Sequence, residues 1–229
     1  MEFRYETHCH SSTCSRCAHS TPEELVRAYH QKGFAGMVLT DHFVHGNTCV
    51  DASLPWEIRM KQYYDAYLQA KAVAESLDFD VIFGIEHAYG SGLEALCYGI
   101  DLDFLLENRD LASLSIEDFS KRVHQWDGML VQAHPYRYGG QELRFPLDYL
   151  DGIEVYNAGN SPEKNLMAMQ LSLCSGLIMT SGSDLHRSDE PRLGIAGISL
   201  PYRIRNGKEL VEALRRKDHR LIFPDEPWR

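Results

Sequence analysis

The sequence predicts one α/β domain with the architecture of a β/α barrel. Two observations predict this fold class. Strand-like apolar runs alternate with helix-like segments along the 229 residues, which is the order typical of a sheet with helical crossovers. Histidines and carboxylates recur where the apolar runs end, and β/α barrels gather their functional side chains at the C-terminal ends of the strands. No linker, low-complexity tract or repeat interrupts the pattern, so residues 1–229 are expected to form a single domain.

The expected helices begin at capping residues. Thr21 and Glu24 form a capping box, Pro22 suits the first helical position, and Gly33 should end this helix just after Lys32. Similar capping signals and apolar spacing predict the other helices. The expected helices span residues 21–32, 56–77 and 115–126, and two more begin at 161–163 and 206–209.

The expected strands are short and apolar. Several carry aliphatic or β-branched residues on both faces, as strands covered on both sides do. The repeated β-then-α order favours a parallel sheet. After a first strand near Phe3-Arg4-Tyr5, the expected strands are residues 37–40, 80–85, 95–100, 129–133, 152–156, 177–180 and 220–223.

Composition narrows the classes of partner and compartment. Hydrophobic residues make up 44% of the chain and charged residues 24%, which is ordinary for a soluble globular protein. The formal net charge of -10 argues against broad nucleic-acid binding, whereas bound divalent cations would still allow a small anionic substrate. No run is apolar for long enough to span a membrane, and the first residues lack the apolar stretch of a signal peptide. A cytoplasmic protein is expected, with its six cysteines as thiols or ligands.

Three short motifs carry most of the metal-binding signal. In His8-Cys9-His10 the two histidines are two residues apart, so on a strand both imidazoles point to one face and can reach one metal. Gly182-Ser183-Asp184-Leu185-His186 repeats this spacing with a carboxylate and an imidazole, and His134-Pro135 follows another apolar run. Each motif alone is typical of a polar cap at a strand end, but together they favour a metal site.

On these residues the sequence resembles the PHP (polymerase and histidinol phosphatase) superfamily. The resemblance extends from His8 to about His186. Its motifs stand in the family's order: His8-Cys9-His10, Thr40-Asp41-His42, Gly84-Ile85-Glu86, Ala133-His134-Pro135 and Gly182-Ser183-Asp184-Leu185-His186. The resemblance implies a distorted (β/α)7 TIM-like barrel with metals at its C-terminal mouth. It also implies hydrolysis of a small phosphorylated substrate, such as histidinol phosphate or a small phosphodiester, by water that the metals activate.

The resemblance further implies ligands for two or three divalent ions, which would be zinc, manganese or iron. The implied ligands are His8, His10, Cys17, His42, Glu86, Glu94, His134, Asp184 and His186. Glu86 would bridge two ions. Cys17 and Glu94 depart from the family pattern, since each replaces a residue type more usual there. His19 is the alternative to Cys17.

Phosphate also needs positive partners beyond the metals. Arg137 and Arg187 follow metal-ligand motifs closely, and a guanidinium can bind a phosphate through two parallel hydrogen bonds. His186 or His42 is the candidate proton donor to the leaving group.

Three other interpretations remain open at the level of sequence. An amidohydrolase-like barrel also uses an HxH pair, further histidines and a late aspartate. A PHP module that binds metal without catalysis would keep most of the same residues. Cys14 and Cys17, with histidines nearby, could form a structural zinc knuckle, although the second CxxC that completes such a site is absent.

Overall fold

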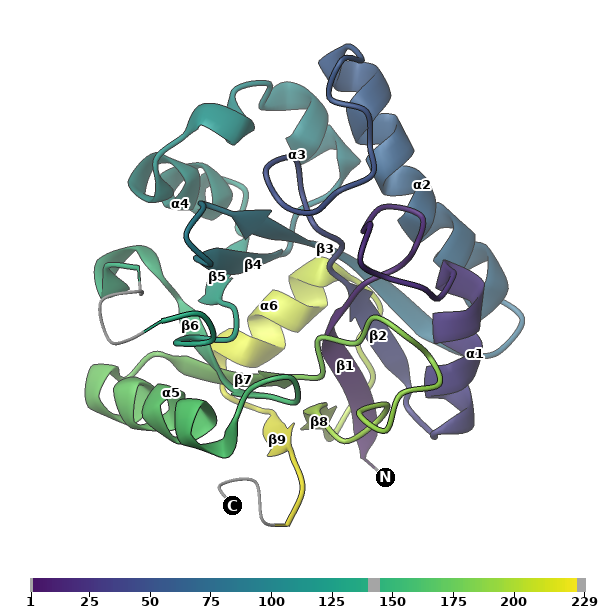
Figure 1. Ribbon diagram of the computed structural model, residues 1–229. Coiled ribbons are helices and arrows are strands. Elements are labelled where there is room, and N and C mark those ends of the chain that lie inside the picture. Colours follow the sequence, from purple (N-terminus) through teal and green to yellow (C-terminus); the bar gives the residue numbers. More distant parts are fainter. Residues whose placement is uncertain (1, 140–144, 226–229) are drawn as a thin grey trace.

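The computed structural model describes residues 2–139 and 145–225. In these residues nine strands form one sheet in the order β7-β6-β5-β4-β3-β2-β1-β8-β9, and the sheet curves into a nearly closed barrel (Figure 1). The strands are β1 (Phe3–Cys9), β2 (Gly36–Leu39), β3 (Asp80–Ala88), β4 (Glu94–Tyr98), β5 (Met129–Gln132), β6 (Gly152–Asn157), β7 (Ile178–Gly182), β8 (Gly197–Leu200) and β9 (Arg220–Ile222). The predicted single-domain TIM-like barrel is therefore confirmed as the fold.

The barrel closes between its first and seventh strands. The hydroxyl of Thr7 in β1 donates a hydrogen bond to the carbonyl oxygen of Ser181 in β7 at 2.6 Å. Beyond the end of β7, the amide of Asp184 donates to the carbonyl oxygen of His8 at 2.8 Å, and the amide of His10 donates to that of Leu185 at 2.9 Å. These bonds hold the segment after β7 against the end of β1, so the motifs His8-Cys9-His10 and Asp184-Leu185-His186 lie side by side.

The expectation of a parallel sheet is wrong for three strands. β4 runs antiparallel to both β3 and β5, β8 runs antiparallel to β1, and β9 runs antiparallel to β8. The connection from β3 to β4 is residues 89–93, which is too short for a parallel crossover and permits only a hairpin. The remaining neighbours, β1 with β2, β2 with β3, β5 with β6 and β6 with β7, are parallel.

The predicted helices are all present, although Ser161 makes no side-chain capping bond at the start of α5. The helices of the structure are α1 (Pro22–Gln31), α2 (Trp56–Ala74), α3 (Leu102–Glu107), α4 (Ile116–Gln125), α5 (Pro162–Ser175) and α6 (Gly207–Arg215), with 3-10 turns at Leu111–Ser113 and Leu147–Tyr149. The capping box of Thr21 and Glu24 is formed in full at the start of α1. Ser115 and Asn206 accept hydrogen bonds from the third amides of α4 and α6. Neither the short helix α3 nor the strand β8 was predicted.

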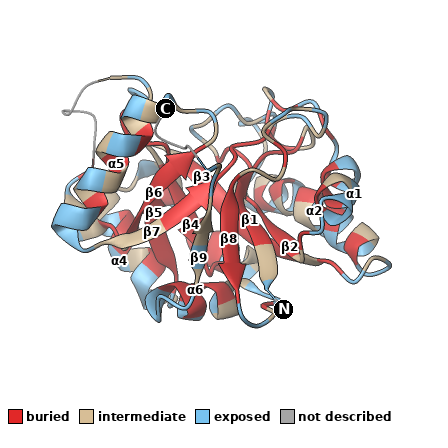
Figure 2. Cartoon of the chain, turned by 90° about the horizontal axis from the view of Figure 1, so that it is seen from below, coloured by how far each residue is buried: buried red, intermediate tan, exposed pale blue. Residues whose placement is uncertain are grey.

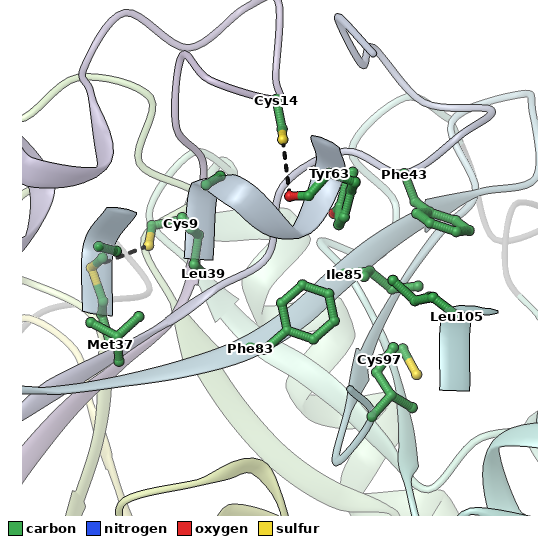
Figure 3. Close-up of a cluster of buried hydrophobic side chains, with 14 of the residues drawn as sticks. Cys9, Cys14, Met37, Leu39, Phe43, Tyr63, Phe83, Ile85, Cys97 and Leu105 are labelled. Atoms are coloured by element: carbon green, nitrogen blue, oxygen red, sulfur yellow. Dashed lines mark hydrogen bonds between the residues drawn. The ribbon is translucent and has the colours of Figure 1, made fainter. Parts of the chain in front are cut away.

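The core has layers inside and outside the ring of strands. Inside, side chains such as Val38, Leu96 and Val131 pack against α6, which covers one end of the barrel (bottom of Figure 2). Outside, the largest apolar cluster joins the strands to α1–α4, and a smaller one joins β6 to α5. Figure 3 shows part of the outer cluster, with Met37 and Phe83 among the buried side chains. The described residues contain no helix that is both long and apolar enough to cross a membrane.

Candidate metal centre

The structure brings the predicted ligands together at one end of the barrel, where β1, β3, β5 and β7 end. These residues are His8, His10, Cys17, His42, Glu86, Glu94, His134, Asp184 and His186. The ring centroids of His10 and His186, which come from opposite ends of the sequence, are 4.5 Å apart. The expected convergence of strand ends on one point is thus confirmed. Among the residues that the structure describes, four overlapping groups of three side chains have ligand atoms within 4.8 Å of one another.

Glu86 lies at the centre of these groups and is 1% exposed. Its Oε1 lies 2.9 Å from His134 Nε2 and 3.2 Å from His8 Nε2. Its Oε2 lies 2.6 Å from His42 Nδ1 and 3.6 Å from His10 Nε2. Each carboxylate oxygen therefore faces a different pair of imidazoles, which is the arrangement that a bridging carboxylate requires.

Asp184 and His186 extend the cluster toward solvent. Asp184 Oδ1 lies 3.0 Å from His10 Nε2 and 3.5 Å from His8 Nε2. The Nδ1 of His186 lies 2.9 Å from the carbonyl oxygen of Asp184. A carbonyl oxygen can only accept, so Nδ1 carries a proton, and Nε2 is the ring atom that could bind a metal when unprotonated or donate to a substrate when protonated.

Two of the ligand residues have an unusual backbone conformation. His134 has a φ of 26° and Asp184 a φ of 52°, and neither is glycine. The left-handed region costs energy for such residues, and surrounding structure must hold them there. At both positions the turn re-aims a side chain from a strand end into the cluster.

Mutual proximity shifts the pKa values of the group strongly. Burial raises the pKa of Glu86, but the imidazoles of His8, His134 and His42 outweigh burial and hold it well below its usual range. For Asp184 burial is likewise outweighed by His8, His10 and Arg137, and its pKa is also well below the usual range. Burial and the neighbouring His42 lower the pKa of His10 to about 3. The carboxylates are therefore anionic and His10 is neutral.

The other three buried histidines behave differently in the metal-free cluster. Burial lowers the pKa values of His8, His42 and His134, but their anionic neighbours outweigh burial and raise the pKa of His8 well above its usual value, that of His42 to about 11 and that of His134 to about 9. A cation that binds these imidazoles would have to displace their protons.

The donor set fits divalent cations. Imidazole and carboxylate donors suit zinc, manganese and iron, and a thiolate suits zinc or iron as well. His42 Nδ1 and Glu86 Oε2 are buried and 2.6 Å apart, yet among the described residues neither has a partner in hydrogen-bond geometry. Buried polar atoms without such partners are costly, and a cation between the side chains would satisfy them.

The two cysteines of the predicted CxxC pair face different surroundings. Cys17 Sγ lies 3.2 Å from His42 Nε2 at the edge of the cluster. Burial raises its pKa, but hydrogen bonds with His186 and His42 outweigh burial and lower the value to about 6. Cys14 is buried in the outer core, and its Sγ contacts the carbonyl oxygen of Tyr63 at 3.3 Å (Figure 3). His19, the alternative ligand, is exposed, and its backbone amide donates to the carbonyl oxygen of His186 at 2.8 Å.

Glu94 is the first residue of β4 and lies next to the cluster, at the start of the second strand of the β3–β4 hairpin. Its Oε2 lies 3.2 Å from His134 Nε2, and its side chain is 15% exposed. Glu94, His42 and Glu86 also form one of the groups whose ligand atoms lie within 4.8 Å of one another. Glu94 therefore reaches the cluster, as the resemblance implied.

The two predicted phosphate-binding arginines differ in their surroundings. The side chain of Arg187 is 50% exposed, and its guanidinium bonds Asp189 through Nε and one terminal nitrogen, each at 3.0 Å. The side chain of Arg137 is only 17% exposed, and it contacts the carboxylate of Asp184. Its Nε donates to Asn160 Oδ1 at 2.9 Å. Arg187 is accessible from solvent, whereas Arg137 is mostly buried and packs against a ligand carboxylate.

Sequence reasoning missed two buried carboxylates that support the ligands. Glu6 accepts hydrogen bonds from the amides of His8 and Ser183 at 2.8 and 2.9 Å and from the hydroxyl of Tyr29 at 2.7 Å. Glu154 in β6 contacts the ring of His8 at 3.0 Å. Both are 0% exposed. The available signal was an acidic residue in an otherwise apolar strand, because such a residue needs buried partners.

A family model for the PHP domain matches residues 6–181. This match covers most of the chain, and the protein belongs to the PHP domain family. No curated protein matches the chain.

Solved structures with the same fold have low sequence identity to the chain. A two-domain protein from Bacteroides vulgatus that contains a predicted PHP-like metal-dependent phosphoesterase is 18% identical, with a TM-score of 0.71; the match covers 97% of this chain and 65% of that one. This chain thus spans just under two thirds of that relative. An amidohydrolase from Chromobacterium violaceum with bound sulfate and no metal is 19% identical, with a TM-score of 0.64 and coverage of 92% and 96%. A lesion-specific endonuclease from Pyrococcus furiosus is 14% identical, with a TM-score of 0.69 and coverage of 96% and 58%.

Proposed function

We propose that the protein is a metal-dependent hydrolase of phosphate esters. The observation that carries the proposal is the position of Glu86, whose two oxygens face two separate pairs of imidazoles in one buried cluster. Such a shared carboxylate is what a site with two adjacent cations needs. His8, Glu86 and His134 would hold one ion, and His42, Glu86 and Glu94 a second. His10, Asp184, His186 and Cys17 would complete the second ion's shell or hold a third.

Divalent cations in this site would supply a water-derived nucleophile near neutral pH and neutralise charge on the phosphoryl oxygens. The chain's own residues contribute at the edge of the cluster. His186 has the most exposed side chain of the five clustered histidines, at 20%, and is our candidate proton donor to the leaving group. Arg187 lies one residue away on the same loop and is the candidate phosphate ligand, since its exposed pairing with Asp189 can exchange at little cost.

Two structural relatives support an oxyanion substrate, although one of them is named an amidohydrolase. The Bacteroides vulgatus protein contains a predicted phosphoesterase, and the Chromobacterium violaceum structure holds sulfate, a tetrahedral oxyanion like phosphate. The net charge of -10 favours a small phosphorylated substrate over extended nucleic acid. We also propose a cytoplasmic location, because the six cysteines are free thiols, as a reducing compartment would keep them.

The test is turnover by protein reconstituted with zinc, manganese or iron(II). The panel contains phosphomonoesters including histidinol phosphate, small phosphodiesters, an oligonucleotide, carboxylic esters and lactams. Turnover of a phosphoester that chelator abolishes and metal restores is the expected result. Turnover of only the carboxylic substrates would favour an amidohydrolase. Binding of metal without turnover of any substrate would favour a non-catalytic module.

A further inference from the structure

Glu154 is a buried carboxylate that touches two predicted ligands from different strands. Its Oε1 lies 3.0 Å from the Nδ1 of His8, which belongs to β1. Its Oε2 accepts the backbone amide of His134, which follows β5, at 2.8 Å. The same oxygen accepts a hydrogen bond from Nδ2 of Asn157 at 2.8 Å. Glu154 is 0% exposed, so water cannot replace any of these partners.

Both hydrogen bonds to Oε2 of Glu154 have a fixed direction, with Glu154 as the acceptor. A backbone amide such as that of His134 can only donate. Asn157 is held in one orientation, since its Oδ1 accepts the amide of Gly159 at 2.8 Å and a guanidinium nitrogen of Arg137 at 2.5 Å. Its Nδ2 must therefore point at Glu154. This oxygen of Glu154 is an acceptor in both contacts.

The second oxygen of the same carboxylate, Oε1, faces His8 Nδ1 at 3.0 Å, and a carboxylate oxygen there favours a ring proton on Nδ1. A neutral, metal-binding His8 then keeps its lone pair on Nε2. Nε2 is the atom within the cluster, 3.2 Å from Glu86 Oε1 and 3.5 Å from Asp184 Oδ1. The opposite tautomer would place a proton where a metal has to bind.

We propose that Glu154 is a positioning residue for metal binding. It holds His8 in the Nδ1–H tautomer, and it holds the left-handed backbone of His134, so that ligands from β1 and β5 reach the same ion. The inference rests on the metal binding of the proposed function and is independent of phosphoester turnover. Some carboxylates accept a hydrogen bond from the ring nitrogen of a ligand histidine that does not bind the metal. Mutation of such a carboxylate typically lowers metal affinity by about 10–100-fold.

Glu154→Gln is the informative variant because it keeps the shape and removes one acceptor. If its amide oxygen faces His134 and Asn157, its NH2 group faces His8 Nδ1 and favours the wrong tautomer. If the amide is turned round, the NH2 group meets two donors. In either orientation metal binding loses support.

The matched control is Glu6→Gln. Glu6 is equally buried and bonds the backbone of the same histidine, through the amide of His8 at 2.8 Å, but no hydrogen bond joins it to an imidazole in the described structure. It is expected to lower stability without changing the ring proton of His8.

The experiment measures zinc binding by calorimetry and the ring protons of zinc-loaded, 15N-histidine-labelled protein by NMR, with the His8 signal assigned by its loss in His8→Gln. Wild type should show Nδ1–H and a metal-bound Nε2. Glu154→Gln should bind zinc about 10–100-fold more weakly and shift or lose that ring N–H signal, while Glu6→Gln should keep the signal.

Several results would overturn the proposal. They are a wild-type His8 that binds zinc through Nδ1, a zinc affinity of Glu154→Gln within twofold of wild type, or an equal loss of the signal in Glu6→Gln. The wild-type spectrum decides the tautomer even if Glu154→Gln does not fold. Wild-type protein that bound no zinc, manganese or iron(II) would instead remove the metal binding on which the proposed function rests.

Discussion

Replacing Glu86 by alanine should remove more than one metal ion from the protein. Both oxygens of Glu86 are engaged, one toward His134 and His8 and the other toward His42 and His10, at 2.6 to 3.6 Å. The variant Glu86→Ala leaves each of these pairs without the anion between them. A change confined to one side chain is therefore expected to act on two sites.

The size of the effect can be bounded from below. Loss of a partner that only supports a ligand costs about 10–100-fold in metal affinity, and a direct ligand should cost at least as much. Each factor of ten is about 1.4 kcal/mol. For two sites that share Glu86, the summed loss is then about 3–6 kcal/mol or more, so ions should dissociate during gel filtration at micromolar protein.

The assay is elemental analysis after gel filtration, together with calorimetric titration of the metal-free protein. Glu94→Ala is the matched control, because Glu94 also contacts His134 but at 3.2 Å and from the rim, where its side chain is 15% exposed. We expect Glu94→Ala to lose at most one ion. Equal metal content in Glu86→Ala and wild type, with both folded, would refute the bridging role.

Three further predictions concern the edge of the site, the arginines and pH. Cys17→Ser should weaken the most weakly bound ion, because Cys17 Sγ lies 3.2 Å from His42, and Cys14→Ser should leave metal affinity unchanged; equal calorimetric titrations for both variants would contradict this. Arg187→Ala should lower phosphoester turnover by about 10–1000-fold at unchanged metal content, whereas Arg137→Ala should also lose metal because it contacts a ligand carboxylate; intact turnover in Arg187→Ala would exclude it as the phosphate ligand. In the metal-free protein, burial lowers the pKa of His134, but two neighbouring carboxylates outweigh burial and raise it to about 9. The stability from its proton is complete below the unfolded pKa of about 6.5 and is lost as pH rises through 9, so the thermal midpoint in chelator should fall between pH 7 and 9 and should not fall in zinc-loaded protein.

The sequence predicted most of the helices and the place of the site for local reasons. The capping box at Thr21 and the caps at Ser115 and Asn206 are interactions within four residues, so the sequence alone reveals them. The ligand motifs follow apolar runs, and barrel geometry then brings strand ends together. The strand β8 was not predicted, and its position and antiparallel direction depend on its partner β1, nearly 200 residues away in the chain.

The supporting carboxylates could not be assigned for a similar reason. Glu6 and Glu154 act on residues that are remote in sequence, Glu154 on His8 and Glu6 on Ser183. An isolated acid in an apolar strand shows that a buried partner must exist, but it does not say which one. Only the closed barrel identifies His8 as that partner.

The helix α6 covers one end of the barrel. It packs against Val38, Leu96 and Val131 inside the ring of strands, at the end away from the C-terminal strand ends that carry the ligands. We therefore expect substrate and product to use the other, ligand-bearing end. Under the proposed chemistry, outgoing phosphate and incoming ester would compete for one route. Inorganic phosphate should consequently inhibit as a competitor of the substrate, and the loops of the mouth, rather than the barrel interior, should govern how fast the site clears.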